Sequence, residues 1–399
     1  MSVTMRSPSI LTLAFCLIVP ASADAQETRA EEIAAKQKEK AAALKPYQPN
    51  AFEKVMASLE ESFVSPPSGF YPAFGSIYPG GGFTFGAGYR QFYGRSAVWN
   101  VQGLYSLKNY KQVEVGTSTP WHGRGRFGYE FKGGWFDAPQ VGYYGIGMGD
   151  GPGRANYRVS NGYAAFTGRM RPTRWTRLEG EVGFDGIDTG EGSGRHPSIE
   201  TVYDAVTAPG LGSSPSFIRT EGLAAIDTRA SSAYAARGGF YGIRFTNYAD
   251  TGDDFSFQRL HAEAIQHVPL LRGNWVISLR GRVMSILDEN DAVPYYLLPQ
   301  IGSGSTLRGY PTGRFRDRHS LLTSAEFRWI PNRLGLDMAI FYDAGKVAPE
   351  FSELDFSDLE SSWGFGARFH TPSAMILRLE AARPKTGKWR LIFSTGAAF

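Results

Sequence analysis

Apolar and polar residues alternate with a period of two through most of the chain. The pattern is plain in four stretches, residues 124–132, 177–184, 277–283 and 375–380. In each stretch one set of positions is apolar and the other set is repeatedly charged. Because successive side chains of a strand point to opposite faces, the pattern predicts β-strands with one apolar and one polar face from about residue 70 to residue 399.

Two architectures fit such strands, a soluble β-sandwich and a transmembrane β-barrel. Aromatic residues recur near the expected strand ends, as in the interfacial girdles of membrane barrels. They are Tyr143, Tyr144, Trp275, Trp329 and Trp389. At roughly 20 residues per strand with its connection, residues 70–399 hold about sixteen strands. We therefore expect an all-β fold, a transmembrane antiparallel barrel of about 16 strands, in which residues 186–221 have the weakest strand pattern.

The first 25 residues have the features of a secretory signal peptide. Arg6 precedes an apolar run at residues 10–19, which is about half the length that a helix needs to cross a bilayer. Small residues follow up to Ala25, so we expect Sec-dependent export and cleavage of the signal. The only cysteine, Cys16, lies within the run, and the mature chain then has no thiol for a disulfide or a metal site.

Residues 26–69 differ in composition from the rest of the chain. Alanine, glutamate and lysine dominate up to residue 45, and two prolines separate this part from a second helical pattern at residues 52–63. The segment predicts two short helices with too few apolar residues for a core of their own. We interpret it as a helical periplasmic arm that acts as a tether, a plug or a docking site for a periplasmic partner.

The overall composition agrees with a β architecture. The chain has 48 glycines, 27 phenylalanines and 20 tyrosines, yet its mean hydropathy is −0.27. No stretch after the signal is apolar enough for a transmembrane helix. The formal net charge of +4 is spread along the sequence, so we expect no nucleic-acid partner.

The chain ends in a strand pattern that runs from Trp389 to Phe399. Its apolar face carries Trp389, Leu391, Phe393 and Phe399, and a terminal phenylalanine on such a strand resembles the recognition signal of bacterial outer-membrane proteins. We therefore expect the barrel-assembly machinery to read these residues during biogenesis. Gly396 lacks a side chain near the expected closing seam and should weaken pairing there.

A more specific pattern spans the connection after Met284 and the two strands that follow it. Its parts are an arginine-glycine-aromatic tip on a long loop of roughly thirty residues, an acidic strand and an aromatic-x-Asp-x-Gly strand. The residues are Arg308, Gly309, Tyr310, Glu326, Asp343 and Gly345. In this order the motifs resemble the BamA superfamily of bacterial surface-antigen barrels, and the resemblance covers about residues 70–399.

The resemblance implies a barrel of a Gram-negative-type outer membrane, in contact with outer-membrane lipid and lipopolysaccharide. Family members that fold other barrels or secrete partners carry periplasmic POTRA domains. Residues 26–69 are too few for such a domain, which places the chain with the POTRA-less branch. The resulting hypothesis is a protein that assists insertion, assembly or export of protein or lipid at the outer membrane. The alternative is a passive pore or structural barrel without insertase activity.

The resemblance also places Arg308 on a loop folded back into the barrel. Period two turns Glu326 and Asp343 toward the lumen, because their neighbours Phe327 and Tyr342 belong to the apolar face. A guanidinium suits a carboxylate in two-point geometry. We therefore expect Arg308 to contact Asp343, Glu326 or both, and so to lock the loop inside the barrel.

Other polar groups have simpler interpretations. His261, Glu263 and His267 share one strand face, but a strand spreads the two imidazoles over roughly 20 Å, which suits a hydrogen-bonded polar lumen better than a metal ion. Residues 250–254 have the composition of a hairpin loop as well as that of a cation site, and residues 145–153 that of a turn rather than a phosphate cradle. With neither a GxSxG elbow nor an acyl-transfer triad in the sequence, we expect no catalytic residue, no cofactor, no metal and no enzyme activity.

Overall fold

The computed structural model describes residues 31–39, 68–94, 97–122, 125–271, 274–288, 292–331, 335–370 and 375–399. Residues 31–39 form a helix in which every residue is exposed, as the composition of this segment predicts. The second expected helix, at residues 52–63, lies outside the described residues. No helix of the described part has the length and apolarity needed to cross a bilayer.

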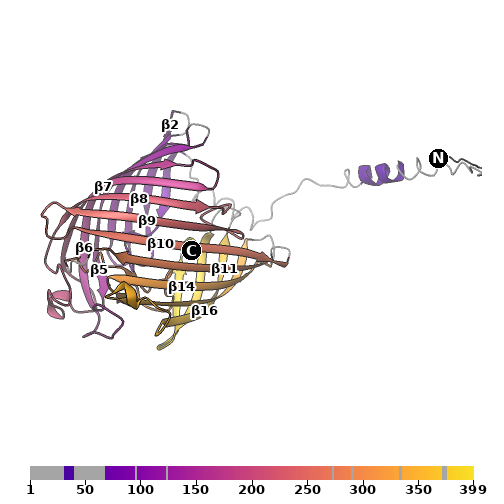
Figure 1. Ribbon diagram of the computed structural model, residues 1–399. Helices are drawn as coiled ribbons and strands as arrows, with labels where there is room; N and C mark the ends of the chain where they lie inside the picture. Colours follow the sequence, from indigo (N-terminus) through magenta and orange to yellow (C-terminus); the bar gives the residue numbers. More distant parts are fainter. Residues whose placement is uncertain are drawn as a thin grey trace, which may run out of the picture. The chain divides into compact units, whose positions relative to one another are not determined.

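In the described part of the chain, sixteen strands form one antiparallel sheet and follow one another in chain order, with a single step from β11 to β14 (Figure 1). The first eight are β1 Gly69–Phe74, β2 Thr84–Tyr93, β3 Ala97–Ser106, β4 Lys111–Ser118, β5 Phe127–Tyr143, β6 Ala155–Met170, β7 Thr176–Glu191 and β8 Ser216–Asp227. The others are β9 Gly238–Asp250, β10 Phe257–Leu270, β11 Trp275–Ile286, β14 His319–Trp329, β15 Leu336–Ala348, β16 Glu360–His370, β17 Met375–Pro384 and β18 Arg390–Ser394. The expected strand number is confirmed.

Two kinds of short element lie in the described connections, a two-stranded sheet and 3-10 helices. β12 (Gln300–Ile301) and β13 (Phe315–Arg316) form a separate two-stranded sheet inside the β11–β14 loop. The 3-10 helix η1 (Ile199–Thr201) lies between β7 and β8. The stretch with the weakest strand pattern, residues 186–221, is thus the end of β7, a loop at residues 192–215 and the start of β8. A second 3-10 helix, η3 (Phe351–Glu353), lies between β15 and β16.

The apolar face of the sheet is exposed and the polar face is enclosed. On β15, Met338, Ile340 and Tyr342 are 45%, 61% and 52% exposed, whereas Asp343 is wholly buried. Strand β14 repeats the pattern, with Phe327 exposed. An apolar outer face and a polar interior are what a barrel presents to lipid and to its own lumen, so the faces expected from period two are confirmed.

A cluster of buried aromatic and aliphatic residues covers the long-loop end of β5–β11, and we call it the tyrosine-rich cap. Its tyrosines are Tyr110, Tyr143, Tyr157, Tyr203, Tyr248, Tyr295 and Tyr296. Tyr143 packs edge-on against Tyr203 and Tyr295, with ring centroids 4.8 and 5.1 Å apart. The expectation that Tyr143 belongs to an interfacial girdle was therefore wrong. Strand β5 has 17 residues, more than the roughly ten that a membrane needs, and Tyr143 lies in the excess length.

The first and last strands of the sixteen-stranded sheet, β1 and β18, are also its shortest. β1 has six residues and β18 has five, and the ladder of the described residues does not join them. The two ends nevertheless approach each other, because the rings of Phe83, in the turn after β1, and Phe393 of β18 are 6.4 Å apart. The sheet is thus curved almost onto itself with an unpaired seam.

Candidate functional site

The connection between β11 and β14 is a folded hairpin. Gln300–Ile301 pairs with Phe315–Arg316 to form its stem. An apolar cluster fixes this stem to the lumenal faces of β14 and β15. The buried members of the cluster are Ile301, Leu307, Tyr310, Phe315, Leu322 and Val347. Apolar packing alone therefore holds the loop stem against β14 and β15.

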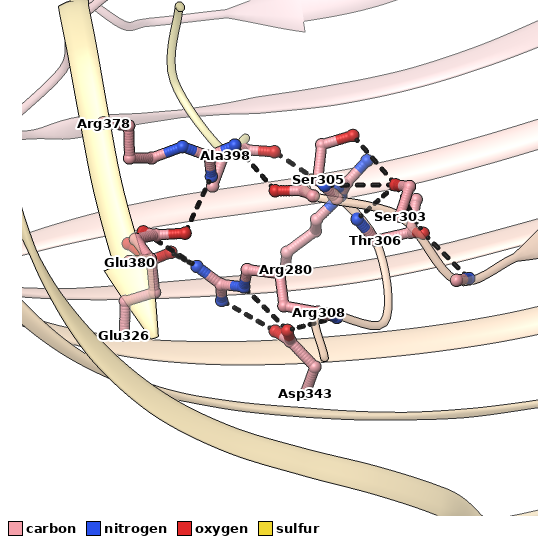
Figure 2. A network of polar contacts seen from close by, with 12 residues as sticks. Arg280, Ser303, Ser305, Thr306, Arg308, Glu326, Asp343, Arg378, Glu380 and Ala398 are labelled. Atoms are coloured by element: carbon pink, nitrogen blue, oxygen red, sulfur yellow. Dashed lines mark hydrogen bonds and ion pairs between the residues drawn. The ribbon is translucent and has the colours of Figure 1, made fainter. Parts of the chain in front are cut away.

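The tip of the loop is a compact polar turn. Gly302 has a φ of +101°, a left-handed conformation that favours glycine. Its N–H donates to the Thr306 hydroxyl, and the Ser303 hydroxyl accepts from the N–H groups of Ser305 and Thr306, each at 3.1 Å (Figure 2). Ser303 thus uses its hydroxyl to close the turn, and the turn directs Arg308 toward β14 and β15.

Arg308 contacts both carboxylates that the sequence assigns to it. Its Nε and Nη2 donate to the two oxygens of Asp343, each at 2.7 Å, and its Nη1 donates to Glu326 at 2.6 Å (Figure 2). Its backbone N–H also donates to Asp343, at 3.1 Å. Arg308 is only 1% exposed. The expected contact is confirmed, in the two-point geometry that strengthens an arginine-carboxylate pair.

Two more arginines and a further carboxylate extend this pair into a network. Arg368 of β16 donates to Glu326 at 2.6 Å and to Glu380 of β17 at 2.6 Å. Arg378 of β17 lies 3.5 Å from Glu380. We call Arg308, Glu326, Asp343, Arg368, Arg378 and Glu380 the lumenal charge network. Its three cations and three anions balance, as buried charges must to offset the cost of their desolvation.

The aromatic-x-Asp-x-Gly motif of β15 supplies three different contacts to the loop. The guanidinium carbon of Arg308 lies 3.6 Å from the centre of the Phe341 ring, in cation-π geometry. Asp343 accepts the hydrogen bonds described above. A methyl group at Gly345 would lie 2.6 Å from the Leu321 carbonyl oxygen and 3.1 Å from Ile301, so glycine lets the loop stem approach the strand.

The residues after Arg308 fit against the last strands. Gly309 has a φ of +92°, and a methyl group there would lie 3.2 Å from the backbone nitrogen of Pro384 in β17. The Tyr310 hydroxyl donates to Glu360 of β16 at 2.5 Å. The arginine-glycine-aromatic tip therefore contacts four consecutive strands, β14 to β17, on their lumenal face.

The family of the chain follows from the half that holds this site. The family model described as the Omp85 superfamily domain matches residues 200–399, which include β8–β18 and the whole lumenal charge network.

The chain belongs to the Omp85 superfamily.

Solved structures share this Omp85 fold. BamA from Haemophilus ducreyi lacking POTRA domains 1-3 gives a TM-score of 0.61 at 14% identity, over 83% of this chain and 69% of that one. CdiB from Escherichia coli gives 0.53 at 14% identity, over 83% and 62%, and CdiB from Acinetobacter baumannii gives 0.50 at 11% identity, over 81% and 58%. The chain thus spans about three fifths of each CdiB protein. No curated protein sequence matches it.

The resemblance to the BamA superfamily is confirmed by these findings. Ahead of the Omp85 barrel, the described residues form the helix 31–39 and no POTRA-like fold, in agreement with the POTRA-less branch. Barrels of this superfamily are outer-membrane proteins, and the chain is an outer-membrane β-barrel related to BamA and CdiB.

The end of this Omp85 barrel differs from the sequence-based expectation. Strand β18 stops at Ser394, and Gly396 follows in a turn with a φ of +82°. The Ala398 carbonyl oxygen accepts from Arg280 of β11 at 3.5 Å, and the Phe399 ring lies 5.6 Å from the same guanidinium. The prediction that Phe399 lies on the apolar outer face was wrong, because the turn at Gly396 carries the last residues toward a lumenal arginine.

The other residues of that predicted face do lie outward. Trp389, Leu391 and Phe393 are 44%, 90% and 60% exposed. The prediction that Gly396 lies within the closing strand and weakens its pairing was wrong, because β18 ends at Ser394 and Gly396 lies beyond the ladder. Gly396 ends the strand by its backbone conformation instead of weakening a ladder position.

Four residues that contact the loop or belong to the lumenal charge network were not identified from the sequence. They are Arg280, Arg368, Arg378 and Glu380. Arg280 and Arg378 donate to the tip carbonyls of Ser305 and Gly304, at 2.9 and 2.6 Å (Figure 2). All four fall on the polar face of the period-two pattern, which was the available signal. That pattern gives the face of a residue and not its partner on a distant strand.

The alternative polar sites resolve into structural contacts. His267 lies 2.8 Å from the Ser278 hydroxyl, and Glu263 accepts from Arg280 at 2.7 Å. The Asp250 carboxylate accepts from the N–H groups of its own hairpin, at 3.1 to 3.2 Å. Gly147, in the glycine-rich stretch 145–153, donates to the Arg316 carbonyl oxygen at 2.7 Å. This stretch therefore supports the β11–β14 loop from its other side.

Proposed function

We propose that this chain assists insertion, assembly or export of protein or lipid at the outer membrane, and that it acts at its sheet edge and not through its lumen. The observation that carries the proposal is the β11–β14 loop, which the buried Arg308 network fixes inside the barrel against β14 and β15. The tyrosine-rich cap covers the long-loop end of β5–β11. A route through the lumen would need both to move.

The unpaired seam supplies the alternative route. Strand edges with free N–H and C=O groups are templates for a further strand, and β1 and β18 present such edges. The lumenal charge network reaches β17, the neighbour of β18. We infer that the locked loop keeps the last strands in place while β18 remains open to an incoming chain.

Reconstitution in liposomes tests the proposal. The wild-type protein should speed the folding of an unfolded outer-membrane barrel client, followed by heat-modifiable gel mobility, and should conduct few ions. Arg308→Ala should reduce the acceleration, whereas Arg219→Ala, on the opposite part of the lumen, should not. Liposomes that conduct ions but never speed client folding would favour the passive pore.

Two partner assignments belong to the same proposal. The exposed helix 31–39 is suited to reach a periplasmic partner, and the barrel-assembly machinery is proposed to read Trp389, Leu391, Phe393 and Phe399 before the chain folds. Removal of Phe399 should lower the amount of barrel assembled in cells, because the machinery would lose part of its signal. It should change the unfolding of refolded protein little, because Phe399 lies near Arg280 and beyond the end of β18. Deletion of the arm, residues 27–63, should leave a barrel that still folds.

A further inference from the structure

The hairpin between β17 and β18 carries three exposed positive charges. Arg383, Lys385 and Lys388 fall within six residues, and all are exposed. None of them takes part in an ion pair with the described residues. Residues 383–390 contain no acidic residue. In the neighbouring β15–β16 connection, Asp355 pairs with Lys346 at 2.8 Å and Glu360 accepts from Tyr310, while Glu350, Glu353 and Asp358 are exposed. The hairpin therefore presents a net positive surface.

An aromatic row lies beside these charges on the outer wall. Arg383 is directly opposite Trp363 in the β16–β17 ladder, and directly paired residues of an antiparallel ladder share a face. Trp389 lies 5.0 Å from Trp363 and 5.8 Å from Phe365, ring to ring. Tryptophans at this level of a barrel mark the boundary between hydrocarbon and headgroups.

An apolar groove of about 820 Å³ continues from this row along the outer wall. Phe365 belongs both to the aromatic row and to the groove. The next row along the ladder joins Phe365, Ala381 and Leu391, roughly 7 Å from the level of Arg383. The groove also includes Leu379, Phe393 and Ile340. The positively charged hairpin is thus continuous with an apolar groove on the outer wall.

We propose that this hairpin and groove bind one phosphate-bearing, multiply acylated lipid of the outer leaflet, a lipid of the lipid A class. β11 and β17 run in the same direction in the antiparallel sheet, so the β17–β18 hairpin lies at the same end as the long β11–β14 loop. Long loops of such barrels are extracellular, which puts the hairpin at the outer leaflet. The three cations would pair with the phosphates, and the tryptophans would lie at the level of the headgroups. The apolar groove would hold acyl chains. The proposal depends on outer-membrane placement and orientation, and it does not require the assembly role.

Native mass spectrometry of the full chain in detergent tests the proposal with lipid A and with its dephosphorylated form as probes. The wild type should retain lipid A at least about tenfold more tightly than the dephosphorylated lipid, because each basic residue near an anionic lipid contributes roughly fivefold. The triple variant Arg383→Gln/Lys385→Gln/Lys388→Gln should lose this preference. The charge-conserving variant Arg383→Lys/Lys385→Arg/Lys388→Arg should keep it.

A matched control removes three exposed cations elsewhere, with Lys111→Gln/Arg195→Gln/Arg237→Gln. This control should retain the wild-type preference. Ala381→Trp keeps every charge and fills the groove, so it should weaken binding of lipid A. Heat-modifiable mobility reports whether each variant is folded.

Three results would overturn the proposal. They are equal retention of the two lipids by the wild type, equal loss in the triple variant and its matched control, and undiminished lipid A binding by Ala381→Trp. Because no client protein is present, any of these results would leave the assembly role untouched.

Discussion

Two parts of the lumen contain the same kind of arginine-carboxylate pair, but the two pairs differ in how far they are buried from solvent. On β14–β17, Arg308, Glu326 and Arg368 are 1%, 4% and 2% exposed. On β7–β8, Arg219 donates to Asp185 at 2.8 Å, yet the side chains of Arg219 and Asp185 are 18% and 12% exposed. The distances are alike, and the difference is the β11–β14 loop, which brings Arg308 and its apolar stem onto the first part.

The comparison shows that burial, and not the pairing distance, sets what such a pair does. Breaking a buried ion pair leaves an uncompensated charge and costs roughly 3–5 kcal/mol, whereas solvent-exposed pairs contribute about 0.2–1 kcal/mol. We therefore expect the covered part to fix the loop and the last strands. The open part should act as a polar, tolerant wall.

The largest effect is expected for Glu326→Ala, because Glu326 accepts from both Arg308 and Arg368. Its removal leaves two buried guanidinium groups short of an anion. The free energy of unfolding in detergent should fall by about 4 kcal/mol, measured by urea titration. A fall below about 1 kcal/mol, the value for an exposed pair, would erase the difference between the two parts of the lumen.

Arg308→Ala comes next, because it frees the loop and removes the two side-chain hydrogen bonds that Arg308 donates to Asp343. The unfolding free energy should fall by about 3 kcal/mol, and residues 287–318 should become sensitive to protease. Arg308→Lys should restore resistance only in part, since an ammonium group cannot make the two-point contact with Asp343. Full rescue by lysine would show that charge alone holds the loop.

Gly345→Ala and Gly180→Ala make a matched pair of smaller changes on two strands. A methyl group at Gly345 meets the Leu321 carbonyl oxygen and Ile301, whereas one at Gly180 has nothing within 4 Å. We expect a cost of about 1–3 kcal/mol for Gly345→Ala from overpacking. Gly180→Ala should stay within roughly 0.5 kcal/mol of the wild type. Similar midpoints for the two variants in a urea titration would contradict the tight approach of the loop.

The smallest effect in the lumen is expected for Arg219→Ala. Its pairs with Glu181 and Asp185 are 2.6 and 2.8 Å long but partly exposed, so the unfolding free energy should fall by about 1 kcal/mol or less. The protease pattern of the β11–β14 loop should not change. A newly cleaved loop in this variant would show that the two parts are coupled.

The fold could be predicted from the sequence because period two is a local signal. Strand faces follow from it, and so does the inward direction of Glu326 and Asp343. The number of strands follows from the chain length, at roughly 20 residues per strand with its connection. The partners Arg368 and Glu380 were not predicted, because the register between neighbouring strands sets which side chains of β14, β16 and β17 meet on the lumenal face. Alternation along one strand contains no information about that geometry.

The end of the chain shows a second limit. Period two continues from Trp389 to Phe399 in the sequence, yet the strand ends at Ser394. The turn at Gly396 and the contact of Phe399 with Arg280 are tertiary, and they override a local pattern that is otherwise well suited to a strand. Tyr143 is a similar case, where loops cover a residue whose type is typical of an interface.

The central claim is that the Arg308 pair is a buried lock and not one lumenal pair among many. Double-mutant cycles on Arg308–Asp343 and on Arg219–Asp185, with both single alanine variants of each pair, measure this directly by urea unfolding. We predict a coupling energy of about 3 kcal/mol for Arg308–Asp343 and below about 1 kcal/mol for Arg219–Asp185. Equal coupling energies for the two pairs would contradict the account.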